Sequence, residues 1–302
     1  MSFPELMKLA TDIRIKAQNR TALEAAAVGM RVDPAKLNFS FIEAAFAPFS
    51  QMPDPARYDP LIADLNVAMA ELRTDPVPQS GLTAGVVLTD KTLNKMTTAG
   101  GYLNSWTGVA AMEFKRNFID NFKTIADNQF NMLSTMKGAL QAHQAMWRSA
   151  HEDIKKIAED TRNALDNMSS CNKNQWTFFF SVMAAVGTIS AAGITIITGG
   201  ATAPVVAIGA TASLGSAGVS GKTARSDASG ATVDAILREM HSAINKLTTH
   251  IQTVETEQIA DKVRVLTALA HNQKHNLISA RPQLVGMSDS DLLGKSGMGR
   301  PH

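Results

Sequence analysis

Charge is absent from the middle of this sequence. The segment from Thr177 to Gly221 contains no Asp, Glu, Lys, Arg or His, although 19% of the whole chain is charged. A hairpin at the surface of a water-soluble protein keeps one polar face, and this segment has none. The sequence therefore predicts a segment that is either deeply buried or in contact with lipid.

Several other features are scarce. Cys171 is the one cysteine, which excludes an intrachain disulfide and leaves a free thiol or an intermolecular bridge. Aromatic residues make up 6% of the chain, whereas Ala, Leu and Met are common, a composition that favours helices. A formal net charge of +2 gives no reason to expect a nucleic-acid partner. Residues 1–20 lack the uncharged core of a secretory signal, so we expect a cytosolic protein or one exported without a cleaved signal.

Hydrophobic periodicity predicts an all-α fold. Four shorter helices are expected over Pro4–Val28, Ser40–Ala47, Asp54–Arg73 and Asp90–Leu103. Two much longer helices are expected over Gly108–Ser170 and Ala228–Ala280, and neither contains an internal proline. A long helix with an apolar stripe needs a helical partner, so the two long helices are predicted to pair antiparallel in an elongated bundle, with the apolar segment at their shared tip.

The apolar stripes of the two long helices are regular. The first stripe consists of Phe114, Phe118, Phe122, Ile125, Met132, Met136, Leu140, Met146, Trp147, Ala150, Ile154, Ile157, Leu165 and Met168. The second stripe consists of Val233, Leu237, Met240, Ile244, Leu247, Ile251 and Val254, and after a one-residue phase slip it continues through Ile259, Val263, Leu266, Ala270 and Leu277. Spacings of three and four residues place each stripe on one helix face.

The predicted domain organisation follows from these elements. Residues 1–103 are expected to form N-terminal helices that pack on the bundle. Residues 104–281 are expected to form the long helical hairpin, with the apolar hairpin at 176–221. Residues 282–302 lack periodicity and are expected to form a flexible tail.

The uncharged segment has the dimensions of a membrane hairpin. Phe178–Thr198 would be roughly 31 Å long as a helix, against a hydrocarbon core of about 30 Å. Gly199–Pro204 is a turn signal, and Val205–Val219 returns as a shorter arm of roughly 22 Å. The many Ala and Gly residues favour closely packed helices in lipid, whereas the Ile and Thr residues also permit a β-tongue, so both forms stay open.

Two groups of residues are candidates for membrane contact. The residues expected to insert are Phe178, Phe179, Phe180, Val182, Ile189, Ile194, Ile196, Ile197, Val205, Val206, Ile208 and Leu214. Lys173, Trp176, Lys222 and Arg225 flank them and are expected to anchor the segment at anionic headgroups. Burial of the hairpin at the centre of a soluble bundle is the alternative.

No catalytic arrangement, cofactor site or metal site is predicted. Residues 216–223 imitate the end of a phosphate-binding loop, but Ser216 stands where that motif needs a glycine, and nothing else indicates an α/β unit. His271 and His275 are one helical turn apart, yet no third ligand is evident, so a solvated helix face is expected. We therefore expect a protein that is not an enzyme and that binds neither nucleic acid nor a small-molecule substrate.

The stretch SWTGVAAMEF, Ser105–Phe114, carries a resemblance to a known family. Trp106 and Gly108 lie between two predicted helices, where glycine lets the chain reverse and tryptophan fills the junction. Helix, Trp-x-Gly turn and helix is the arrangement of the WxG family of type VII secretion substrates from actinobacteria and related Gram-positive bacteria. The sequence resembles long members of that family, which also carry an apolar Gly/Ala-rich hairpin, over about Asp54–Gly221.

The WxG resemblance implies export without a cleaved signal, assembly as a helical-hairpin dimer or larger ring, and membrane contact in several members. The family's export signal, Tyr-x-x-x-Asp/Glu, is absent, because Ile62 and Trp106 stand four residues after Tyr58 and Tyr102. Export would then depend on a partner or on a divergent signal. The implied partners are membrane lipid and either further copies of this chain or a WxG-type helical protein.

The order of the predicted elements also resembles helical pore-forming toxins of the cytolysin A and haemolysin BL type, in which long helices enclose an apolar hairpin that swings out and inserts. We therefore expect a secreted, non-enzymatic protein that inserts its hairpin into membranes and forms an oligomeric pore. Two alternatives are a structural or partner-binding component of a secretion apparatus with a permanently buried hairpin, and a phage-encoded or intracellular helical rod.

Overall fold

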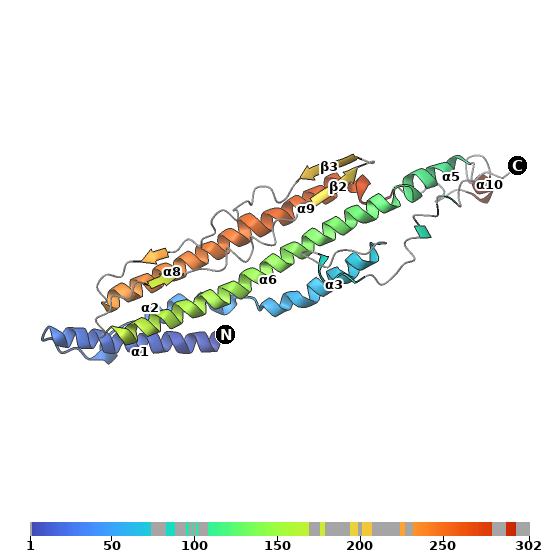
Figure 1. The fold of residues 1–302 in the computed structure, drawn as a ribbon. Helices are drawn as coiled ribbons and strands as arrows, with labels where there is room; N and C mark the ends of the chain where they lie inside the picture. Colours follow the sequence, from blue (N-terminus) through green and yellow to red (C-terminus); the bar gives the residue numbers. More distant parts are fainter. Residues whose placement is uncertain are drawn as a thin grey trace. The chain divides into compact units, whose positions relative to one another are not determined.

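The chain has an all-α fold with a few short strands (Figure 1). The computed structural model describes residues 2–73, 83–87, 95, 96, 99, 101, 108–168, 176–178, 194–198, 201–206, 224–226, 232–279 and 288–293. The chain divides into two compact units, each assembled from three stretches of sequence. Unit 1 contains residues 1–57, 142–188 and 213–259, and unit 2 contains residues 58–141, 189–212 and 260–302.

Unit 1 is built from helices that begin with well-defined caps. Its helical elements are α1 (Phe3–Ala27), η1 (Pro34–Lys36), α2 (Ser40–Phe46), η2 (Ala47–Gln51), η3 (Pro55–Arg57), the second part of α6 (Phe122–Asn167), α8 (Val233–Thr253) and η6 (Val254–Ile259). The backbone N–H of Ser2 donates to the Glu5 carboxylate at 2.7 Å, which forms a capping box at the start of α1. The Thr232 hydroxyl accepts from the Ala235 N–H and caps α8.

The core of unit 1 depends on α8. All seven residues predicted for its stripe, from Val233 to Val254, are buried, which confirms the predicted face of this helix. Figure 1 shows α8 alongside α6, whose own buried residues in this unit include Met146, Ile154 and Leu165. Phe46 of α2 is also fully buried. Burial of these large side chains is the main stabilising contribution to unit 1.

Unit 2 has smaller apolar clusters. Its helical elements are α3 (Tyr58–Glu71), α5 (Val109–Phe114), η5 (Lys115–Ile119), the first part of α6, α9 (Ala260–Asn272), η7 (Lys274–Asn276) and α10 (Asp289–Leu293). One cluster joins Met69 and Ala70 of α3 to Val86 and to Phe130 of α6. Gly85 lies beside this cluster with φ of +83°, and a Cβ atom there would be 2.9 Å from the Asn66 amide nitrogen. Both the dihedral angle and the close approach therefore require glycine at this turn.

A π-helix accounts for the phase slip in the second long helical pattern. Element η6 is a π-helix over Val254–Ile259, and both of its terminal residues are buried although they are five positions apart. A π turn contains one residue more than an α turn, so it keeps the two apolar residues on one face. The predicted slip is thereby confirmed and explained.

The first long helix is interrupted where an unbroken helix was predicted. A second π-helix, η5, follows α5, and a turn at 120–121 precedes α6. The Asn121 side-chain amide donates to the Arg116 carbonyl at 3.1 Å, a local bond that competes with regular helix bonding. The very long helix predicted over Gly108–Ser170 is confirmed, with an irregularity near Asn121 that the sequence did not predict, and α6 itself runs for 46 residues.

The shorter predicted elements can be compared directly. The helices expected over Pro4–Val28, Ser40–Ala47 and Asp54–Arg73 are confirmed as α1, α2 and the pair η3 and α3. The helix expected over Asp90–Leu103 lies largely outside the described residues. In the tail, α10 forms where no helix was predicted, because the Ser288 hydroxyl accepts from the Asp291 N–H and caps it.

Two stripe residues are wrongly assigned by periodicity. Met136 and Val263 are each 44% exposed, although both were predicted to face the core. The buried position beside Met136 is occupied instead by Lys137, which has no exposed surface. Regular spacing identifies the face of a helix, but it does not identify every neighbour that the helix meets.

Within the described residues, four short strands form two antiparallel pairs. Strand β1 (Trp176–Phe178) pairs with β4 (Ala224–Ser226), and Thr177 lies opposite Arg225. Strand β2 (Ile194–Thr198) pairs with β3 (Ala201–Val206), and Thr198 lies opposite Ala201. The register shifts between Ile194 and Ile196, opposite the part of β3 that contains Pro204. Proline has no N–H to give to a ladder and is tolerated at such an irregularity.

Truncation of Phe46 tests the core of unit 1. We expect Phe46→Ala to lower the free energy of unfolding by about 3–5 kcal/mol, because the side chain is fully buried and its loss leaves a cavity. The matched control is Phe41→Ala in the same helix, where 45% of the residue is exposed and a loss below about 1 kcal/mol is expected. Urea denaturation measures both losses, and equal losses would contradict this account of the core.

Candidate functional site

The candidate site is the base of the uncharged segment, where it joins the helices of unit 1. The segment begins within β1 and is followed closely by β4, and the ladder between these strands brings its two ends together. In unit 2, β2 and β3 run antiparallel with only Gly199 and Gly200 between them in the sequence. Two residues are a common length for the connection of an antiparallel hairpin.

The structure describes only some of the predicted membrane residues. Trp176 and Phe178 lie in β1, Arg225 in β4, Ile194, Ile196 and Ile197 in β2, and Val205 and Val206 in β3. Phe179, Phe180, Val182, Ile189, Ile208, Leu214, Lys173, Lys222 and Trp106 lie outside the described residues. The alternative of a helical or a β hairpin was left open by the sequence, and the described parts of the segment are strands.

Gly108 lies where the helix of the predicted WxG turn begins. It is buried and forms the N-cap of α5, with φ of −72° and ψ of 152°. Any residue adopts this extended conformation, so the backbone angles of Gly108 do not by themselves require glycine.

Among the described residues, no helix combines the length and the apolar character needed to cross a bilayer.

Three charged residues of α1 contact the helix ends that flank the candidate site. The Lys16 ammonium lies 2.6 Å from the Asp166 carboxylate, and the Arg20 guanidinium donates to the Asp166 backbone carbonyl at 2.7 Å. The Glu24 carboxylate accepts from the backbone N–H of Val233 at 3.2 Å. Asp166 is next to the last residue of α6 and Val233 is the first residue of α8. We refer to Lys16, Arg20 and Glu24 as the clamp residues.

The clamp residues occupy consecutive turns on one face of α1, because they are spaced by four. Other residues of α1 hold it on its neighbours. Arg14 and Thr11 donate to the Glu43 carboxylate of α2, at 3.0 and 2.9 Å. Desolvation acts to raise the pKa of Glu43, but the hydrogen bonds from Arg14 and Thr11 and the charge of Arg14 together lower it below its ordinary value. The carboxylate is therefore charged at neutral pH, as this contact requires.

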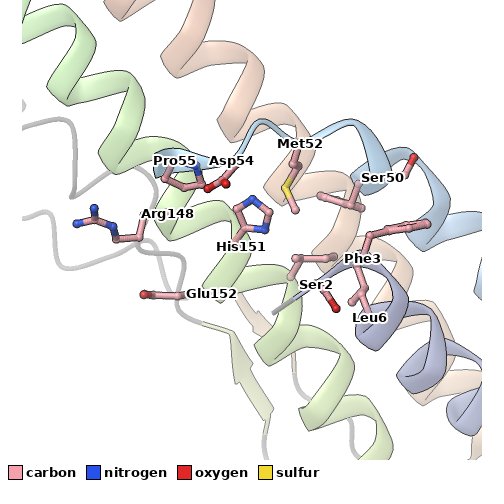
Figure 2. A pocket seen from close by; sticks show the side chains of 12 residues that line it. Ser2, Phe3, Leu6, Ser50, Met52, Asp54, Pro55, Arg148, His151 and Glu152 are labelled. Atoms are coloured by element: carbon pink, nitrogen blue, oxygen red, sulfur yellow. The ribbon is translucent and has the colours of Figure 1, made fainter. Parts of the chain in front are cut away.

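A cleft of about 500 Å3 opens elsewhere in unit 1 (Figure 2). It is lined by Ser2, Phe3, Leu6, Phe49, Ser50, Met52, Asp54, Pro55, Arg148, His151, Glu152 and Ile154. Figure 2 shows the His151 ring facing Met52, while Arg148 and Glu152 extend away from that ring.

Two polar residues of the cleft, His151 and Asp54, make structural contacts. The His151 Nε2 atom lies 3.2 Å from the Pro53 carbonyl, and the Gln144 amide donates to the Pro55 carbonyl at 3.0 Å. The Asp54 carboxylate accepts from the Ala56 N–H at 3.0 Å. These bonds fix residues 53–57 against α6. They account for His151 and Asp54 without a catalytic role.

A buried lysine marks unit 2. Lys137 of α6 has no exposed surface, and its ammonium donates to the Ala84 carbonyl at 2.5 Å. Desolvation lowers the pKa of Lys137, because burial disfavours the charged amine. The contact ties the turn at 83–87 to α6. Asn128 and Gln129 of the same helix donate to the carbonyls of Asn276 and Leu277, at 2.9 and 2.7 Å.

Within the ranges that the structure describes, no three or more His, Cys, Asp or Glu residues gather to bind a metal ion. Comparison with protein-family models, with curated proteins and with solved structures finds no match to this chain.

Sequence reasoning missed the clamp residues and Lys137. The clamp residues have a visible signal, because a Lys-x-x-x-Arg-x-x-x-Glu row places three charges on one helix face. Its contacts, however, join residues about 150 and 209 positions apart and cannot be read from local spacing. Lys137 lies seven residues after the buried Phe130 and four after the partly buried Leu133, which places it on their face of α6 and not on the predicted stripe.

The pH dependence of stability tests the burial of Lys137. Its pKa is lowered in the folded state, whereas the unfolded chain keeps a value near 10.5. The unfolded state therefore binds more protons between these two values, and the free energy of unfolding is expected to rise with pH through this window. Lys137→Met removes this increment. The free energy of unfolding of wild type minus that of Lys137→Met should therefore become more positive as pH rises from neutral toward 10.5.

Urea unfolding of both proteins over this pH range measures the difference. Lys246→Met, at an exposed position of α8, is the matched control. A difference for Lys137→Met that does not change with pH would contradict the burial of a charged amine.

Proposed function

We propose that this protein is a non-enzymatic helical protein that inserts its uncharged segment into lipid membranes, with oligomerisation of the inserted form. The observation that carries the proposal is the absence of charge from Thr177 to Gly221, in a chain that is 19% charged overall. Transfer of apolar surface from water to lipid contributes about 25 cal/mol per Å2, so roughly 300 Å2 would supply about 7 kcal/mol. This energy is sufficient to drive a rearrangement between two states.

The position of the segment supports the same proposal. Its ends are joined in the β1 and β4 ladder, so both ends leave unit 1 at one place. A segment attached in this way can move as one hairpin while the helices on either side stay folded. Arg225 lies in β4, four residues after the uncharged segment ends at Gly221, and a basic residue at this place in the sequence suits anionic headgroups.

Oligomerisation follows from the needs of the backbone in lipid. Every backbone N–H and C=O group must be hydrogen-bonded where water is excluded. The segment would therefore enter as paired helices, or as strands that pair between copies of the chain. Export by the type VII route is a separate prediction that rests on the WxG resemblance around Trp106 and Gly108.

Vesicle binding and leakage test the proposed function. The wild-type protein is expected to bind vesicles of phosphatidylcholine and phosphatidylglycerol and to release an enclosed dye. Ile194→Asp or Ala207→Asp places a carboxylate in the segment, at a cost of about 2.5–3.5 kcal/mol at a bilayer centre. Partitioning should fall roughly a hundredfold, since each 1.4 kcal/mol is a factor of ten.

Ile278→Asp is the matched control, because Ile278 is 55% exposed and lies outside the segment. It should leave vesicle binding unchanged. Wild-type protein that forms a stable complex with a helical partner but never binds or permeabilises vesicles would favour the structural alternative. Equal loss of binding in all three variants would also contradict the proposal.

A further inference from the structure

The second half of α1 is held by polar contacts rather than by apolar burial. The buried residues of α1 are Leu6, Ala10, Ile13 and Ala17, all in its first part. Beyond them Leu23 is 61% exposed, and Val28, directly after the helix, is 73% exposed. Beyond Ala17, the side chains of α1 reach other elements through Gln18, which donates to the Leu37 carbonyl at 2.8 Å, and through Arg20 and Glu24.

The charges of the clamp residues match the two helix ends that they contact. The last carbonyls of a helix lack donors within the helix and carry partial negative charge, which suits Lys16 and Arg20 at Asp166 near the end of α6. The first N–H groups of a helix lack acceptors and carry partial positive charge, which suits Glu24 at Val233. One face of α1 thus satisfies opposite ends of two helices (Figure 1).

These two helix ends are the points from which residues 168–232 leave the helices, and this stretch contains the whole uncharged segment. Lys16 and Asp166 are 29% and 45% exposed in their side chains. Exposed ion pairs of this kind contribute little to stability and are weakened by salt. The contacts are therefore specific in geometry but easily broken.

We propose that Lys16, Arg20 and Glu24 form a polar clamp that holds the end of α6 and the start of α8 together, and that its opening frees the uncharged segment for lipid. The second clause rests on the proposed function. The second half of α1 is the moving part, because its apolar attachment ends at Ala17. The first half stays attached through its buried residues and through Arg14 and Glu43.

Hydrogen exchange tests the clamp without lipid. In the variant K16A/R20A/E24A, the backbone amides of residues 18–27, 163–167 and 233–236 are expected to exchange about tenfold faster, since three weak contacts are lost together. The control K8A/N19A changes two exposed positions of the same helix and should exchange like wild type. Unchanged exchange in the triple variant would overturn the clamp.

Vesicle association tests the second clause. With vesicles of equimolar phosphatidylcholine and phosphatidylglycerol, the triple variant should associate about tenfold faster than wild type and the control. Suppose that wild type does associate with vesicles. If the triple variant then exchanges faster but does not associate faster, the clamp has no role in releasing the uncharged segment. If neither protein associates with vesicles, the proposed function fails, while exchange alone still decides whether the clamp exists.

Reversal of the two charges in the Lys16–Asp166 ion pair distinguishes loss of the ion pair from a folding defect. Lys16→Asp alone places two carboxylates together and should accelerate exchange at residues 163–167. Adding Asp166→Lys restores an ion pair of reversed polarity, and exchange and association should return toward wild-type values. A double variant that behaves like the single variant would show that the ion pair does not hold the helix end.

Discussion

Burial of the apolar face of α8 is the interaction on which unit 1 depends. The stripe residues from Val233 to Val254 are all buried, and Met146, Ile154 and Leu165 of α6 are buried in the same unit. Neither helix could bury such a stripe alone. The pairing leaves the polar faces in water and fixes where the chain between the two helices must begin and end.

The positions of these two helix ends determine what the polar face of α1 contacts. The last turn of α6 and the first turn of α8 carry backbone groups without partners in their own helices. Arg20 and Glu24 satisfy one group at each end, and Lys16 pairs with the nearby carboxylate of Asp166. The same side chains therefore satisfy backbone groups at the ends of two helices and hold together the base of the uncharged segment.

The helices could be predicted from the sequence because helix faces are local properties. The spacing of Val233, Leu237 and Met240 identifies a buried face, and the predicted slip before Ile259 coincides with the π-helix η6. The errors in the prediction arise where contacts with residues distant in the sequence determine which side chains are buried. Met136 is exposed, and Lys137 is buried beside it because the Ala84 carbonyl provides an acceptor. Likewise, the spacing of the clamp residues alone indicates only a solvated helix face, because their partners lie beyond residue 160.

The burial of Lys137 has a chemical consequence. An amine without exposed surface is shielded from acylating reagents that modify lysines on a protein surface. Its acetylation or covalent labelling would require the turn at 83–87 to separate from α6. Lys137 is thus a built-in reporter of local opening in unit 2, and a mass spectrum of the labelled chain would record that opening at a single residue.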